Sequence, residues 1–456
     1  MQHRFLLPAL AALFALSALP LAAQQQSPQP AQERSLQELE TAAAQGDLHA
    51  TQQLYMRCAV AGQTEEARAW ATRYNELLTA RAEAGDPKSM LRLGSRYLTG
   101  GDYTPQSVEQ AVTWFTRASE AGEPSAAYVL GEVFAKQGNV PIAESSYQRA
   151  YELYTKRLEN NPQDMEALYW LGFMQQNGIG APRDPAAGVA KLEQAAQLGS
   201  AWACSQLFKT FYNGIGVPRD EARAYTYARQ MADRTGDGAM AYVVASALIF
   251  GRDGVQQDVE LGERYLDQAV RANIPDAIYM RASRLESAGR MAEALPLLRQ
   301  AASMQQREAT VRFGLLLMSG VEGQLEADEP RGLATLELAA NRLHSPQAAW
   351  ELAKYYDNAG ESDIADSWYV AASNRGVAEA MARRGLLHLL PGNAYVSWSP
   401  TDAYRWWRIG KQAGDATCTL YINLFLYVFT PLLLLLVFGL PAWLGHRARK
   451  RLRPLS

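Results

Sequence analysis

A pattern of small and large side chains returns about every 32 to 41 residues between Ser35 and Asp415. The clearest copies are two turns 36 residues apart, with the sequence NGIGAPRD at 177–184 and NGIGVPRD at 213–220. A repeat of this length is typical of a solenoid of helix pairs, in which each unit buries its apolar face only against its neighbours. The pattern therefore favours a protein that binds partners over one that catalyses a reaction.

The composition supports an all-α fold. Of the 456 residues, 48% are hydrophobic and 20% are charged, which is ordinary for an ordered protein. Segments rich in Ala, Leu, Glu, Gln and Arg favour helix, and no stretch has the regular β-branched alternation of a sheet. A repeat array can reach this length by adding units, without enlarging one core.

We predict about ten helix pairs in the segment 35–415. Their first helices are expected to begin near Ser35, Pro87, Pro124, Pro162, Ala201, Gly238, Pro275, Arg307, Pro346 and Ala378.

The fourth unit shows the local signals most clearly. Residues 165–177 have apolar side chains spaced for one helix face, and Gly178 is suited to end that helix in the left-handed conformation. Asp184 and Pro185 then predict the start of a second helix, since Asp caps free N–H groups and Pro fits the first helical position. Asp220, Asp258 and Ser399 repeat this arrangement.

These residues resemble the Sel1-like repeat family, a relative of the tetratricopeptide repeat. The matching motifs are Leu171-Gly172, Gly178-Ile179-Gly180, Asp184 and residues 195–199, and they return at 214–220 and 365–372. The units at Pro275 and Pro346 have shorter turns, closer to a tetratricopeptide repeat. The resemblance implies a right-handed superhelix with a concave groove that binds ligands.

The resemblance also implies a class of function. Bacterial members are commonly secreted or periplasmic adaptors; some organise exopolysaccharide synthesis and export, alginate included, and others restrain sensor kinases. The alginate-type member is a lipoprotein, whereas in this chain no lipid-bearing cysteine stands directly after the leader.

The two ends of the sequence predict an exported, membrane-anchored protein. Residues 1–23 have the positive start, apolar run and small-residue end of a signal peptide, with an uncleaved anchor as the alternative. Residues 24–34 are rich in Gln and Pro and are expected to form a flexible linker.

Residues 416–445 contain no charged side chain and are long enough for a transmembrane helix. The segment 446–456 follows as a basic tail, expected in the cytoplasm by the positive-inside rule. Its basic residues are Arg447, Arg449, Lys450, Arg451 and Arg453. We expect a single-pass protein of the inner membrane, with its repeats in the periplasm.

Net charge argues against a nucleic-acid partner. The formal charge is −3, and without Arg4 of the leader and the five basic residues of the tail it is −9. Binding to a polyanion needs a basic surface. Of the three cysteines, Cys58 and Cys204 are expected to be buried thiols, and Cys418 could pair with a partner.

The sequence has no recognisable catalytic, cofactor-binding or metal-binding motif. No two histidines have metal-ligand spacing, and no phosphate-binding loop or nucleophile motif occurs. The Gly-Ile-Gly turns follow helices and are interpreted as structural. A carboxylate pair that cleaves envelope glycans stays an alternative, without named residues.

Aromatic and basic residues gather in the last unit, just before the apolar segment. Trp398, Trp406 and Trp407 lie close in sequence to Arg405 and Arg408, with Tyr395 and Tyr404 nearby. One interpretation is packing within the repeat, as for the aromatic pairs at 114–115 and 368–369. The other is contact with the membrane or a membrane partner, because no further repeat follows to cover this unit.

We therefore expect a periplasmic scaffold that recruits proteins to an envelope complex, with exopolysaccharide synthesis or export as one candidate pathway. A regulator that binds a sensor kinase is the main alternative, and a glycan-acting enzyme is the third. Expected partners are envelope or inner-membrane proteins and membrane lipid, with glycan as a further ligand class and no nucleic acid.

Overall fold

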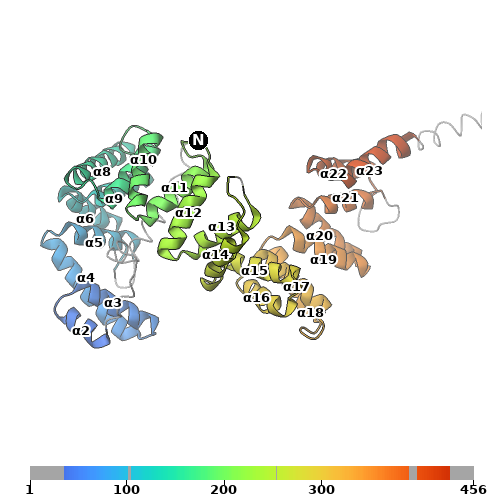
Figure 1. Cartoon of the computed structure of the whole chain (residues 1–456), viewed down its shortest axis with the longest axis horizontal. Coiled ribbons are helices and arrows are strands. Elements are labelled where there is room, and N and C mark those ends of the chain that lie inside the picture. The colour runs from blue at the N-terminus through green and yellow to red at the C-terminus, as the bar shows by residue number, and fades with distance from the viewer. Residues whose placement is uncertain (1–34, 101–103, 253, 390–397, 432–456) are drawn as a thin grey trace, which may run out of the picture. The chain divides into compact units, whose positions relative to one another are not determined.

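The computed structural model describes residues 35–100, 104–252, 254–389 and 398–431 (Figure 1). Within these ranges the chain forms 22 α-helices, numbered α2 to α23, one short π-helix, η2, and no β-strand. The chain divides into two compact units, with the boundary between Gln268 and Ala269 inside α14. The predicted all-α fold is confirmed for the described residues.

The first unit consists of helix pairs that follow one another along the chain, preceded by one extra helix. Its helices are α2 (Leu36–Ala44), α3 (Leu48–Val60), α4 (Thr64–Glu83), α5 (Pro87–Thr99), α6 (Val108–Glu120), α7 (Pro124–Lys136), α8 (Val140–Asn160), α9 (Met165–Asn177), α10 (Pro185–Gln197), α11 (Ala201–Asn213), α12 (Glu221–Thr235), α13 (Gly238–Phe250) and the start of α14 (Val259–Arg271).

The second unit repeats the same design. It contains α15 (Pro275–Ser287), α16 (Met291–Ser303), α17 (Arg307–Ser319), α18 (Glu329–Asn341), α19 (Pro346–Asn358), α20 (Ser362–Asn374), α21 (Ala378–Leu387), α22 (Pro400–Gln412), α23 (Ala416–Leu424) and η2 (Phe425–Phe429). In both units consecutive helices pack on one another, most closely within pairs such as α7–α8 and α17–α18 and less closely between pairs, as expected for a solenoid.

The predicted unit boundaries agree with the helices except at the beginning. Pro87, Pro124, Ala201 and the later predicted starts are the first residues of helices, and α9 begins three residues after Pro162. The prediction for the first unit was wrong. Ser35 caps the extra helix α2, and the pair α3–α4 begins only after Asp47 caps α3.

Side-chain caps start the second helix of several pairs, as predicted. The carboxylate of Asp184 accepts a hydrogen bond from the Ala187 N–H at 3.0 Å, and Pro185 occupies the first turn of α10. Asp220 and Asp258 cap their helices in the same way. These caps satisfy N–H groups that have no partner within the helix.

The two glycines of each Gly-Ile-Gly turn have different tasks. Gly178 and Gly214 end α9 and α11 in the left-handed conformation, with φ of 70° and 68°. Gly180 instead packs on the backbone of α8, where an added Cβ would lie 2.9 Å from the Gln148 nitrogen. Gly216 packs on Pro185 of the preceding pair in a similar way. The second glycine therefore joins one repeat to the one before it.

A small residue on the first helix accommodates a large residue on the second. A Cβ added to Gly94 would lie 2.7 Å from the ring of Phe115, and one added to Gly172 would lie 2.8 Å from Leu192. Phe115 and Leu192 are fully buried. Close approach of the two helices thus depends on the missing side chain.

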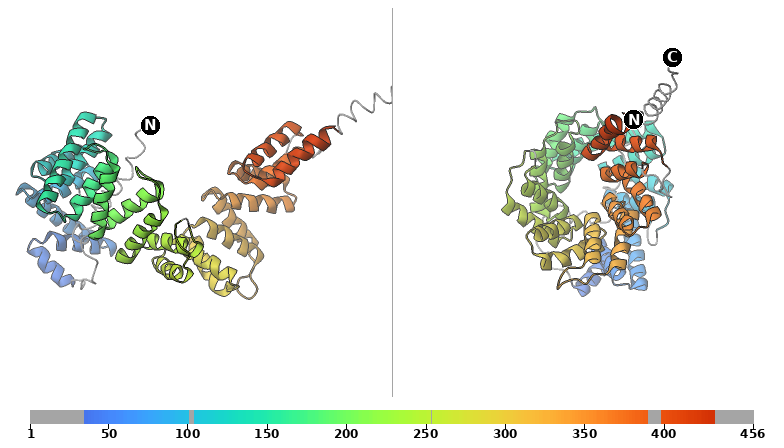
Figure 2. Two further views of the ribbon diagram at one scale, coloured as in Figure 1. Left: turned by 45° about the horizontal axis from the view of Figure 1, so that its top comes forward. Right: turned by 90° about the vertical axis from the view of Figure 1, so that its right-hand side faces the viewer.

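Helix α23 covers the last pair, contrary to the expectation that this unit has an open outer face. It packs on both α21 and α22 (Figures 1 and 2). Asp415 caps it, and Cys418 and Ile422 are buried against the pair. The beginning of the predicted transmembrane segment is therefore part of the solenoid core.

No helix within the described ranges has the length and apolar character needed to cross a bilayer. The rest of the predicted span, 432–445, lies outside these ranges, as do the predicted signal peptide (1–23), linker (24–34) and basic tail (446–456).

Candidate functional site: a polar cluster and aromatic stripe between repeats three and four

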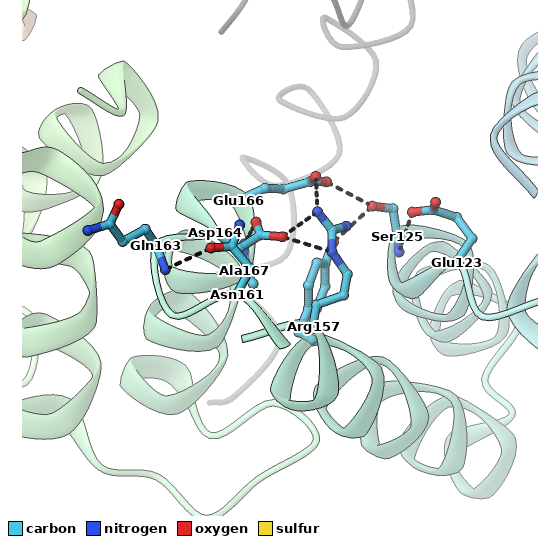
Figure 3. Close-up of polar contacts among 9 residues, drawn as sticks. Glu123, Ser125, Arg157, Asn161, Gln163, Asp164, Glu166 and Ala167 are labelled. Carbon is cyan, nitrogen blue, oxygen red and sulfur yellow. Dashed lines mark hydrogen bonds and ion pairs between the residues drawn. The ribbon is translucent and has the colours of Figure 1, made fainter. Parts of the chain in front are cut away.

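A partly buried polar cluster joins α7, α8 and α9 in the first unit (Figure 3). The Ser125 hydroxyl at the start of α7 lies 2.8 Å from the Tyr154 hydroxyl of α8, and it donates to Glu166 of α9 at 3.4 Å. Ser125 and Tyr154 are buried. Residues separated by 29 and 41 positions thus meet where two repeats join.

Arg157 of α8 is the cation of this cluster. Its guanidinium donates to Asp164 at 2.9 Å and to Glu166 at 3.0 Å, as Figure 3 shows. Asp164 also caps α9 by accepting from the Ala167 N–H at 2.9 Å. Burial by itself would lower the pKa of Arg157, but Glu166 and Asp164 together raise it. The guanidinium therefore stays charged and holds both carboxylates in place.

The cluster contains more carboxylates than cations. Glu123, which caps α7 by accepting from the Ser125 N–H at 3.3 Å, is buried beside the Arg157 group. Burial, and then the nearby charge of Glu166, raise the pKa of Glu123. Three carboxylates and one guanidinium give the region a negative potential that attracts a cation.

A second buried carboxylate lies further along α7. Glu132 is 2% exposed and accepts a hydrogen bond from the Tyr147 hydroxyl of α8 at 2.7 Å. Burial raises the pKa of Glu132, while the bond from Tyr147 opposes that change. Its position inside the helix pair indicates a structural group.

Aromatic rings lie next to the polar cluster. Tyr128 of α7 and Trp170 of α9 are buried, with ring centroids 4.7 Å apart. Tyr169 packs edge-on against both Trp170, at 5.3 Å, and Trp202 of α11, at 6.2 Å. The rings therefore connect the third, fourth and fifth repeats.

Part of this aromatic group remains accessible. Tyr169 and Phe173 of α9 and Trp202 of α11 are each partly exposed, and Glu166 precedes Tyr169 by three residues. Residues three, four and seven apart lie on one helix face, so Glu166, Tyr169 and Phe173 form a line. We refer to Glu166, Tyr169, Phe173 and Trp202 as the aromatic stripe.

The stripe was not predicted, although the sequence contains a signal for it. An acid or amide precedes an aromatic residue by three positions at the same place in other first helices, as Asp276 and Tyr279 in α15 and Gln347 and Trp350 in α19. Alignment of the repeats to one another would have shown this pattern.

The structure separates the aromatic residues that were predicted as contacts in the last repeat. Trp407 is 2% exposed, and its indole N–H donates to the Ala382 carbonyl of α21 at 3.1 Å. Trp406 is partly buried under the guanidinium of Arg384, 4.7 Å from the ring centroid. Trp398 is 61% exposed. Packing therefore accounts for Trp407.

The predicted basic residues of this repeat lie at the surface. Arg405 and Arg408 of α22 are exposed, and Arg405 pairs with Asp402 at 3.4 Å. Tyr395 and the basic residues Arg447, Arg449, Lys450, Arg451 and Arg453 lie outside the described ranges.

All three cysteines are buried free thiols. The pairing considered for Cys418 is not supported, because its side chain packs against Gly410 inside the last repeat. Burial, and then Asp415, raise the pKa of the Cys418 thiol to about 12. Among the described residues, no group of three or more His, Cys, Asp or Glu side chains is arranged to hold a metal ion.

The Sel1 repeat model matches six segments of the chain: residues 87–123, 124–156, 166–200, 203–235, 239–274 and 378–415. The chain contains six Sel1 repeats. The pairs between Pro275 and Asn374 lie outside these matches, in agreement with the departure predicted for the units at Pro275 and Pro346.

Solved structures match the chain, and the first of them shows a similar fold. One is c5321, a protective antigen of uropathogenic Escherichia coli, with 23% identity over 86% of this chain and 82% of that chain and a TM-score of 0.56. A Sel1 repeat protein from Oxalobacter formigenes is 22% identical over 78% of this chain and 90% of that chain, with a TM-score of 0.42. No curated protein sequence matches the chain.

Proposed function

We propose that this Sel1 repeat protein is a scaffold that recruits protein partners to a membrane-bound envelope complex. Sel1 repeats mediate protein–protein interactions and are typically non-catalytic. The observation that carries the proposal is the aromatic stripe, a partly exposed row of rings beside a cluster that contains more carboxylates than cations.

The stripe is suited to act as an anchor point for a partner. Aromatic side chains bury a large area at little entropic cost and are enriched among residues that dominate binding energy. Contacts with Trp170 and Trp202 hold Tyr169 before a partner arrives. The carboxylates of the adjoining cluster favour a partner segment that carries Lys or Arg next to apolar residues.

The proposed location rests on the two ends of the sequence. The leader-like residues 1–23, the uncharged segment 416–445 and the basic residues after it support an inner-membrane protein with periplasmic repeats. Exopolysaccharide synthesis or export is the pathway we propose, because the repeat resemblance includes such adaptors.

Site-specific crosslinking in intact cells tests this function. A photoreactive amino acid replaces Phe173 on the stripe in one strain, and Val60, which is 87% exposed on α3, in the control strain. We expect envelope synthesis or export proteins to be captured from position 173 and not from position 60.

Other captured proteins would change the conclusion. A sensor kinase captured from position 173 would replace the scaffold with a regulator. Equal capture from both positions would mean that the stripe is not the binding surface. Turnover of polysaccharide or peptidoglycan by the purified protein would replace the scaffold with an enzyme.

A further inference from the structure

One face of α23 belongs to the solenoid core. Cys418 and Ile422 are buried, and the rings of Tyr421 and Phe425 lie 5.5 and 6.0 Å from the ring of Trp407. Phe425 also lies 6.2 Å from Tyr404 of α22. The helix is therefore fixed to the last pair as far as Phe425.

The opposite side of α23 and η2 carries large apolar side chains that are exposed, beside the polar Asn423. Leu420 is 54% exposed and Tyr427 is 76% exposed. Leu424, Leu426 and Val428 are between 38% and 47% exposed. Five large apolar residues within nine positions form a patch, whereas single exposed apolar residues are normal at a protein surface. A patch of this kind indicates contact with another apolar surface, which removes it from water.

The sequence that follows η2 indicates what contacts this apolar patch. No charged residue occurs between Ala416 and Gly445, so the apolar character of the patch continues into the segment 432–445. A helix rises about 1.5 Å per residue, so 426–445 would reach about 30 Å, which matches a hydrocarbon core of about 30 Å. Enough apolar chain therefore remains beyond the contacts with the solenoid to cross a bilayer.

We propose that the exposed face of α23 and η2 lies in the outer edge of a lipid bilayer, so that one helix both closes the solenoid and enters the membrane. The proposal rests on the membrane anchoring proposed above. It moves the start of the membrane-embedded segment from Ala416 to the region of Leu424–Tyr427. It also means that no free linker separates the last repeat from the bilayer.

The local backbone is compatible with this position. Pro431 has no N–H to donate, and the π-helical turn of η2 lies just before it. The Thr430 hydroxyl donates to the Phe425 carbonyl at 2.6 Å, and the Thr430 N–H bonds the same oxygen. Such bonds satisfy backbone groups where water is absent. Tyr427 carries an apolar ring with a polar tip, which suits the level of the lipid headgroups.

Fluorescent labels can locate the edge of the bilayer. The full-length protein carries Leu424→Cys or Tyr427→Cys, with Val60→Cys as the exposed control on α3. The native cysteines are buried, and the labelled parent protein gives their background. Each variant receives a polarity-sensitive fluorophore and is placed in vesicles of phosphatidylethanolamine and phosphatidylglycerol.

We expect brominated lipids to quench the labels at 424 and 427 at least several-fold more than the label at 60. Aqueous iodide should show the reverse order. Labels at 424 and 427 that iodide reaches as easily as position 60, on protein that still floats with the vesicles, would overturn the docking and leave the anchoring intact. Labels shielded from iodide but not quenched by lipid would mean that protein, a second copy included, covers the face. Protein that does not float with vesicles would refute the anchoring itself.

Discussion

Gly385 of α21 lies directly against the indole of Trp407 on α22, and a Cβ at position 385 would overlap the ring. The indole N–H reaches the Ala382 carbonyl only because the two helices are this close. Gly94 with Phe115 and Gly172 with Leu192 show the same relationship at the corresponding positions of other pairs. In these pairs a glycine on the first helix leaves room for a large side chain on the second helix, and the two helices can pack closely.

The first prediction concerns the core of the last repeat. Trp407→Ala should cost about 3–5 kcal/mol, since it removes a fully buried ring and leaves a cavity. Trp398→Ala should cost less than about 0.5 kcal/mol, because that side chain is mostly exposed. Hydrogen exchange of α21 to α23 in the full-length protein measures both, because repeat arrays can open locally. Equal protection in the two variants would contradict the packing assigned to Trp407.

The second prediction concerns the helix–helix contact in the fourth repeat. Gly172→Ala should destabilise the first unit by about 1–3 kcal/mol, because the new Cβ would meet the Gly188 carbonyl oxygen at 2.8 Å. Gly314→Ala is the matched control in the second unit, where the nearest atom is a Leu336 side-chain carbon at 3.1 Å. We expect a smaller effect there, measured by local hydrogen exchange. A larger loss from Gly314→Ala would show that backbone contact is not the determining factor.

The third prediction concerns the cation between repeats three and four. Arg157→Met keeps most of the side-chain volume but leaves Asp164 and Glu166 without their guanidinium, which should cost about 1–3 kcal/mol. Arg290→Met removes an exposed pair with Glu293 and should change stability much less. Thermal melting at neutral pH compares the two variants. If Arg157→Met melts with the parent, the cluster does not stabilise the junction.

The fourth prediction concerns pH. The pKa of Glu132 is raised above its ordinary value of 4.5 by burial, so folding favours the protonated acid. Its contribution to stability is greatest below pH 4.5 and falls as the pH rises through the pKa of the folded protein. Glu132→Gln retains an acceptor for the Tyr147 hydroxyl but has no acid that ionises as the pH rises. The melting temperature of this variant relative to the parent should therefore increase with pH.

Glu293 provides a control with the opposite sign for that experiment. Its pKa is lowered by the hydrogen bond from Arg290, so its contribution is lost as the pH falls. Glu293→Gln should therefore show a small relative decrease as the pH rises. If the melting temperatures of the parent and Glu132→Gln change with pH in the same way, burial of the Glu132 carboxylate has no role in stability.

Most of the repeat boundaries could be predicted because their signals are local. A cap such as Asp184, a proline in the first turn and a glycine such as Gly178 each act within a few residues of the helix end. The first boundary was missed because Asp47, which starts α3, follows a short turn that the longer repeat period concealed.

The polar cluster and α23 were beyond this kind of reasoning for different reasons. Ser125 and Glu166 are 41 residues apart, and only the packing of successive repeats brings them together. In α23 no residue is charged and apolar side chains lie on both faces, so composition alone cannot separate the face that packs on Trp407 from the face that does not. The cap at Asp415 was the available sign that a solenoid helix begins there.

The second glycine of each Gly-Ile-Gly turn bears on the order in which the repeats fold. Gly180 and Gly216 pack on residues of α8 and α10, about thirty positions earlier in the chain. Each of these two turns thus packs on residues that the ribosome has already synthesised when the turn emerges. We expect the repeats to assemble vectorially from the amino-terminal side as the chain emerges, one pair serving as the template for the next.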